Sequence, residues 1–168
     1  MTSGALFCGF YSIITAIAGN YVLATIYILF AMILDGLDGR VARMTNTQTS
    51  FGEYFDSLSD MLCFGVAPAL LIYLSSLSMF TSGYLAKISY IACFIYIAST
   101  AIRLARFNSR NQTTDKKYFM GLASPAAAAI LVCYGWLLQD SAVDIQSHVT
   151  LTVILVVSLS ILVVSNLA

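Results

Sequence analysis

The sequence predicts an all-α, polytopic membrane protein with six transmembrane helices, and three observations support this fold class. Of its 168 residues, 60% are hydrophobic and only 10% are charged, whereas soluble domains carry about 25% charged residues. Six apolar runs approach the length of about 20 residues that a helix needs to cross a membrane. The runs lack the apolar–polar alternation of a membrane β-barrel, so helices are expected to satisfy the backbone within lipid.

Glycine, serine and asparagine mark the breaks between these runs, as turn chemistry predicts. The first run ends at Gly19-Asn20, and the third contains Pro68, where we expect a kink. No internal repeat or linker divides the chain, so we expect one integral-membrane domain over residues 1–168, trimmed at either end relative to a longer natural protein. The predicted spans are approximately residues 3–18, 21–39, 51–75, 84–107, 120–138 and 149–167.

The basic residues predict how the helices are oriented. Seven of the eight lysines and arginines lie at or in the loops that follow the second and fourth spans, and only Lys87 lies on the other side. Because cytoplasmic loops are enriched in lysine and arginine, we expect both loops and both chain ends to face the cytoplasm from an inner membrane. The formal net charge of zero provides no basic field for nucleic acid, so we expect no nucleic-acid partner.

Four aspartates lie within 26 residues, at the facing ends of the second and third spans. One carboxylate at the centre of a spanning helix costs about 2.5–3.5 kcal/mol, so four would cost on the order of 10 kcal/mol without compensation. Asp35 and Asp38 share a helix face, as do Asp56 and Asp60. Because the two helices run in opposite directions, the pairs can meet and form an oxygen-rich pocket suited to Mg²⁺ or Mn²⁺.

Small and basic residues flank these aspartates. Gly39, Ala42 and Gly52 would let a bulky ligand approach the backbone, and Arg43 would neutralise phosphate charge. In one alternative, the aspartates pair with Arg40, Arg43 and one another at a hydrated helix end. In others, the chain is a silent assembly subunit or a divalent-cation transporter, whose site is expected near mid-bilayer. The aspartates lie toward one end of the predicted spans and next to arginines, which favours binding of an anionic substrate over passage of a cation.

The aspartates belong to a pattern that resembles a family signature. The sequence contains Asp35-x2-Asp38-Gly39-x2-Ala42-Arg43-x8-Gly52-x3-Asp56-x3-Asp60. This string is similar, at all eight fixed positions, to the signature of the CDP-alcohol phosphotransferases. The resemblance implies a single catalytic domain with a six-helix core, which forms a homodimer and carries its site on the cytoplasmic side. It also implies transfer of the phosphatidyl group of a CDP-activated lipid to an alcohol, with release of CMP.

The resemblance also implies a role for each residue of the motif. Asp35, Asp38 and Asp56 would bind two divalent cations, Mg²⁺ or Mn²⁺. Asp60 would complete the metal site and act as the general base on the acceptor hydroxyl. In-line attack at phosphorus requires charge neutralisation and a positioned nucleophile, and a nearby carboxylate removes the proton. The residues implied to contact the CDP moiety are Gly39, Ala42, Arg43 and Gly52.

Two further segments, at residues 102–108 and 121–128, resemble the phosphatidylserine synthase branch, which implies CDP-diacylglycerol and L-serine as substrates. Arg103 and Arg106 lie on one helical face, and either could hold the serine carboxylate bidentately. Alternatively, they anchor the helix end at lipid headgroups. Inositol phosphate, inositol and glycerol phosphate are alternative acceptors for the same chemistry. The candidate acceptor-binding residues are Arg103, Arg106, Asn108 and Ser124.

Overall fold

The computed structural model describes residues 2–45, 49–77, 84–111, 121–140 and 145–165. These residues are almost entirely helical and contain no strand, which confirms the predicted all-α class. The outer helices are α1 (Thr2–Ile17), α2 (Tyr21–Thr45), α5 (Tyr84–Asn111), α6 (Ser124–Asp140) and α7 (Ile145–Val164). A central helical segment between α2 and α5 comprises α3 (Ser50–Asp60), η1 (Met61–Val66), α4 (Ala67–Ile72) and η2 (Tyr73–Leu77), of which η1 and η2 are π-helical.

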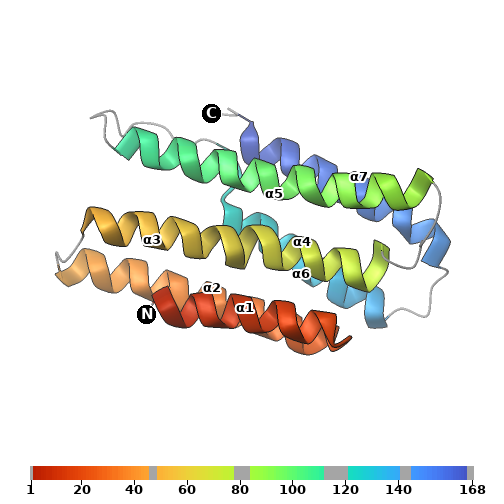
Figure 1. The fold of residues 1–168 in the computed structure, drawn as a ribbon, viewed down its shortest axis with the longest axis horizontal. Helices are drawn as coiled ribbons and strands as arrows, with labels where there is room; N and C mark the ends of the chain where they lie inside the picture. The colour runs from red at the N-terminus through yellow and green to blue at the C-terminus, as the bar shows by residue number, and fades with distance from the viewer. Residues whose placement is uncertain (1, 46–48, 78–83, 112–120, 141–144, 166–168) are drawn as a thin grey trace.

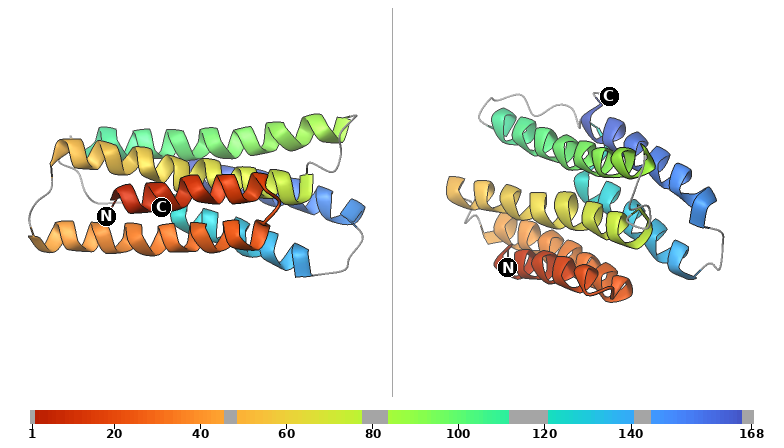
Figure 2. Two further views of the ribbon diagram at one scale, coloured as in Figure 1. Left: turned by 60° about the horizontal axis from the view of Figure 1, so that its bottom comes forward. Right: turned by 45° about the vertical axis from the view of Figure 1, so that its right-hand side comes forward.

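The helices lie side by side along one long axis (Figure 1). The central segment lies between the pair α1 and α2 on one side and the pair α5 and α7 on the other, as Figure 1 and the right-hand view of Figure 2 show, and α6 packs against α4 and α2. Helices α2 and α5 both end, and α3 begins, at the left-hand end of Figure 1. The two basic loops therefore start from the same end of the bundle, as the sequence predicts.

Among the described residues, three helices are long and apolar enough to cross a membrane, namely Tyr21–Val41, Phe51–Leu77 and Ala86–Ser109. The other apolar helices, at Thr2–Ile17, Ser124–Gln139 and His148–Val164, occupy three of the predicted spans. A helix of 17 residues is about 25 Å long, somewhat less than the hydrocarbon core of about 30 Å. Six full spans therefore remain a prediction.

Helix α2 continues to Thr45 instead of ending near residue 39, so the first half of the acidic motif lies on one helix. The break that follows is explained by the start of α3. Thr49 has extended backbone angles, and its hydroxyl accepts a hydrogen bond from the backbone N–H of Gly52 at 3.1 Å. This is an N-cap, and Glu53 in the first turn favours the same helix start.

Small residues allow α1 to pack closely against the central segment. A Cβ atom added to Gly9 would lie 2.6 Å from Sγ of Cys63 in η1, so any larger residue would push these helices apart. The Cys63 thiol donates to the carbonyl of Ala5 at 3.2 Å. Between α1 and α2, the buried hydroxyl of Ser12 donates to the carbonyl of Ala24 at 2.9 Å. These contacts are typical of helix interfaces in membrane proteins and fix the start of α1 beside the acidic motif.

Pro68, where a kink was expected, lies in the first turn of α4 directly after η1. In a regular α-helix, the carbonyl of Phe64 would accept from the N–H of residue 68, which proline lacks. The hydroxyl of Tyr96 on α5 instead donates to this carbonyl at 3.0 Å, and both side chains are fully buried. This hydrogen bond ties α5 to the central segment one turn beyond Asp60.

Replacement of this tyrosine should therefore destabilise the bundle. We expect Tyr96→Phe to lower the free energy of unfolding by about 1–3 kcal/mol, because it leaves a buried carbonyl without its side-chain donor. SDS titration of the protein in detergent micelles would measure the change. Tyr90→Phe is the matched control, since Tyr90 is exposed on the same helix. Equal stability of the two variants would contradict a structural role for the hydroxyl.

Candidate metal centre

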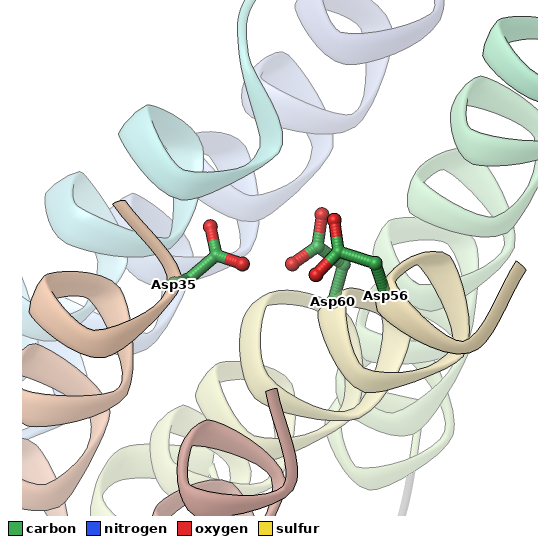
Figure 3. Close-up of side chains that lie close together, drawn as sticks. All are labelled: Asp35, Asp56 and Asp60. Atoms are coloured by element: carbon green, nitrogen blue, oxygen red, sulfur yellow. The ribbon is translucent and has the colours of Figure 1, made fainter. Parts of the chain in front are cut away.

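Three of the four predicted aspartates converge between α2 and α3. Asp35, Asp56 and Asp60 each offer one carboxylate oxygen, and these oxygens all lie within 4.8 Å of one another. Figure 3 shows Asp35 pointing from α2 toward Asp56 and Asp60, which project from successive turns of α3. All three side chains are half-buried. The structure thus brings together three of the four aspartates that the sequence predicts to meet.

The fold of the central segment determines where this cluster lies. Asp56 and Asp60 are four residues apart, so they stack on one helix face. Cys63 follows on the adjoining face and contacts α1 through its hydrogen bond to Ala5. Asp60 is the last residue of α3, and the π-helical stretch η1 begins directly after it. π-helical turns are rare and frequently occur at functional sites.

Asp38 is placed differently from the other three. It is half-buried on α2, and among the described residues it does not belong to the set of oxygens within 4.8 Å. Its carboxylate accepts a hydrogen bond from the hydroxyl of Thr2 at the start of α1. Asp38 does interact electrostatically with Asp35 and Asp56. Its role as a metal ligand stays a prediction.

The charges of this cluster require compensation. Two unit charges 4 Å apart repel by about 4 kcal/mol at an effective dielectric constant of 20, and three ionised carboxylates form three such pairs. Two oxygens bound to one Mg²⁺ at about 2.1 Å lie at most about 4.2 Å apart, which is close to the 4.8 Å within which these three oxygens lie. Carboxylates are the ligands that Mg²⁺ and Mn²⁺ prefer. The donor set therefore fits divalent cations of this class.

Arg103 on α5 and Ser124 at the start of α6 meet beside the cluster. The Nη1 atom of Arg103 donates to Oγ of Ser124 at 2.9 Å, and the arginine interacts electrostatically with Asp60. Ser124 is almost fully buried, and within the described part of the chain the buried Nε atom of Arg103 has no hydrogen-bond partner. These two candidate acceptor residues, from different predicted spans, are thus in contact with each other, and the arginine interacts electrostatically with a candidate catalytic carboxylate.

The other two candidate acceptor residues contact different neighbours. Arg106 is exposed, and its Nη1 donates to the carbonyl of Val164 at the end of α7 at 3.2 Å. The amide oxygen of Asn108 accepts from the hydroxyl of Ser57 at 3.0 Å. Ser57 lies at an unspecified position of the acidic motif, and the sequence analysis missed it. A hydroxyl next to Asp56 in an apolar segment is the signal that could have identified it.

The candidate CDP-binding residues are described only in part. Gly39 is half-buried on α2. Gly52 is exposed, and its lack of a side chain leaves room for the Thr49 cap, since an added Cβ would lie 3.1 Å from the capping hydroxyl. The side chains of Ala42 and Arg43 lie outside the described part of the structure, although both residues belong to α2. Their contacts with a nucleotide therefore stay predictions.

Comparison with known proteins identifies the class to which this fold and cluster belong. A family model described as CDP-alcohol phosphatidyltransferase matches residues 1–164. The chain belongs to the CDP-alcohol phosphatidyltransferase family, which confirms the resemblance found in the acidic motif.

Several relatives share one name, CDP-diacylglycerol–serine O-phosphatidyltransferase. The chain is 43% identical over 132 residues to such a protein from Helicobacter pylori, covering 78% of this chain and 53% of the relative. It is 36% identical over 137 residues to one from Mycobacterium leprae, covering 79% and 44%. A protein of the same name from Methanocaldococcus jannaschii is 35% identical over 133 residues, covering 79% and 60%. The chain thus matches about half the length of these relatives.

Proposed function

We propose that this protein transfers the phosphatidyl group of CDP-diacylglycerol to the hydroxyl of L-serine, giving phosphatidylserine and CMP. The observation that carries this proposal is the convergence of Asp35, Asp56 and Asp60, together with the electrostatic interaction between Asp60 and the cation of Arg103. The carboxylates suit a metal-assisted reaction at a diphosphate, and the arginine suits an acceptor that carries a carboxylate. The shared name of the relatives supports serine as the acceptor.

The proposed reaction assigns a separate task to each side chain. Asp35, Asp38, Asp56 and Asp60 hold two divalent cations, Mg²⁺ or Mn²⁺, which supply positive charge to the diphosphate of the lipid substrate. Asp60 accepts the proton of the serine hydroxyl. The serine oxygen forms a bond to the phosphatidyl phosphorus while the bond from that phosphorus to the CMP oxygen breaks, and CMP leaves. Asp60 then returns its proton to water.

Arg103 is the better of the two arginine candidates for the serine carboxylate. It interacts electrostatically with Asp60, which favours an acceptor bound between this guanidinium and the proposed base. Arg106 instead donates to the end of α7, which suits an anchoring role. We assign the CDP moiety to the small and basic residues of the motif, namely Gly39, Ala42, Arg43 and Gly52, and a supporting acceptor contact to Asn108.

We further propose that the protein is a multi-pass component of an inner membrane and works as a homodimer, with its site at the cytoplasmic surface. Seven of the eight basic residues lie at or in the loops that follow the second and fourth predicted spans, which supports this orientation. Large apolar side chains such as Phe94 and Ile161, 67% and 63% exposed, suit contact with lipid or a second subunit.

A headgroup assay tests the proposed reaction. Full-length protein in detergent, supplied with CDP-diacylglycerol, Mn²⁺ or Mg²⁺ and labelled serine, should produce labelled phosphatidylserine and an equal amount of CMP. Inositol, inositol phosphate and glycerol phosphate serve as competing acceptors. If one of these is used and serine is not, the acceptor is wrong but the reaction class stands. Manganese flux across liposomes without CMP release would indicate a transporter instead.

The two arginines should differ in their effect on serine binding. We expect Arg103→Ala to raise the KM for serine by about 10-fold to 100-fold, because it removes a charge-assisted hydrogen bond to the carboxylate. Arg106→Ala should leave this KM nearly unchanged and lower thermal stability instead. Initial rates over a serine series, at saturating CDP-diacylglycerol, would measure both. An unchanged KM in Arg103→Ala would exclude this residue from acceptor binding.

A further inference from the structure

The loop that enters α6 is held tightly against the end of α7. Gly121 has a φ of +71°, and an added Cβ would lie 2.8–3.0 Å from three carbonyl oxygens at the end of α7. The backbone N–H of Leu122 donates to one of them, that of Leu162, at 3.1 Å. Arg106 donates to the neighbouring carbonyl of Val164. These contacts leave the residue that begins α6, Ser124, with little freedom to move.

Ser124 in turn restricts Arg103. The serine is 1% exposed, and its hydroxyl oxygen accepts from Nη1 of Arg103 at 2.9 Å. An arginine side chain is long and has several rotatable bonds, so one hydrogen bond to a fixed partner removes much of its freedom. The same arginine interacts electrostatically with Asp60, and its buried Nε atom has no hydrogen-bond partner among the described residues. A buried donor of this kind is expected to have a ligand or water as its partner.

We propose that Ser124 is a positioning residue, which holds the Arg103 guanidinium through its hydroxyl so that the remaining N–H groups of the arginine meet the anionic group of the acceptor. The hydroxyl acts through the arginine and does not itself touch the substrate. The identity of the acceptor rests on the function proposed above. The contact between Ser124 and Arg103 is independent of that function, because it is a feature of the structure.

Kinetics of Ser124 variants test this assignment. We expect Ser124→Ala to raise the KM for serine by about 3-fold to 10-fold, while kcat and the KM for CDP-diacylglycerol stay within about 2-fold. Ser124→Thr retains the hydroxyl, so its KM for serine should be close to that of the wild type. In an Arg103→Ala background, Ser124→Ala should have no further effect, because the two side chains act as one unit. Additive effects of the two substitutions would overturn the proposal.

A chemical measurement tests the same contact without catalysis. Phenylglyoxal modifies accessible arginines, and mass spectrometry of the full-length protein gives the rate at each one. We expect Ser124→Ala to speed modification of Arg103 several-fold relative to Arg106. The matched control is Ser160→Ala, since Ser160 is equally buried but donates only within α7, to Val156 at 2.7 Å. Equal rates at Arg103 in both variants would overturn the proposal, whereas failure of the wild type to use serine would overturn only the acceptor.

Discussion

Asp60→Asn is expected to reduce turnover of CDP-diacylglycerol by about 100-fold to 10,000-fold while leaving binding of this lipid largely intact. Asparagine has nearly the same shape as aspartate but cannot accept the proton of the acceptor hydroxyl, and general-base catalysis contributes about 10²–10⁴-fold to a rate. Asp60 is also the carboxylate that interacts with Arg103, which places it toward the proposed acceptor. Single-turnover release of CMP would measure the rate, and calorimetry would measure lipid binding.

Glu53→Gln provides the control for this variant. Glu53 is an exposed carboxylate on the same helix, one turn before Asp56, so its neutralisation changes the charge of α3 without entering the cluster. This variant should turn over at the wild-type rate. Normal turnover in Asp60→Asn would remove Asp60 from the mechanism, and loss of lipid binding in that variant would make it chiefly a metal ligand.

Asp56→Asn should weaken metal-dependent binding of CDP-diacylglycerol, and turnover should fall with it. Loss of an outer-sphere partner already lowers metal affinity by about 10–100-fold, and a direct ligand should matter at least as much. Asp35→Asn should behave alike, because its oxygen belongs to the same set within 4.8 Å although it projects from α2. Manganese titrations of activity, together with calorimetry of lipid uptake with and without Mn²⁺, would measure the effect.

The responses of the three variants to added Mn²⁺ distinguish the proposed metal ligands from the proposed general base. Asp35→Asn and Asp56→Asn should shift the metal dependence, so that excess Mn²⁺ restores part of the activity. Asp60→Asn should stay inactive at any metal concentration. Unchanged manganese dependence in both Asp35→Asn and Asp56→Asn would contradict a metal centre at this position, even though the carboxylates converge.

Helical periodicity predicts most of the acidic cluster, because the positions of these aspartates depend mainly on their spacing along the sequence. The interval of four residues between Asp56 and Asp60 puts both on one face of α3, and opposite helix directions bring Asp35 to them. The same periodicity cannot place Asp38, whose carboxylate contacts Thr2. That contact depends on where α1 packs, and the close approach at Gly9 determines this packing.

Tertiary packing also explains why the two arginines were not distinguished in the sequence. Arg103 and Arg106 are three residues apart and share a helix face, yet one meets Ser124 in α6 and the other meets the end of α7. These partners lie 21 and 58 residues away along the chain. The spacing of residues within α5 does not reveal which of the other helices each side chain contacts.

The π-helical stretch η1 alters which neighbours the central helix faces along its length. Its hydrogen bonds reach back five residues, as in the bond from the Ala67 N–H to the Leu62 carbonyl, so side chains beyond it are rotated relative to those of an uninterrupted α-helix. Asp60, before this stretch, faces a polar cluster, whereas Phe64, within it, is fully enclosed. The central helical segment can thus carry a cluster of carboxylates at one end and fully buried apolar side chains further along its length.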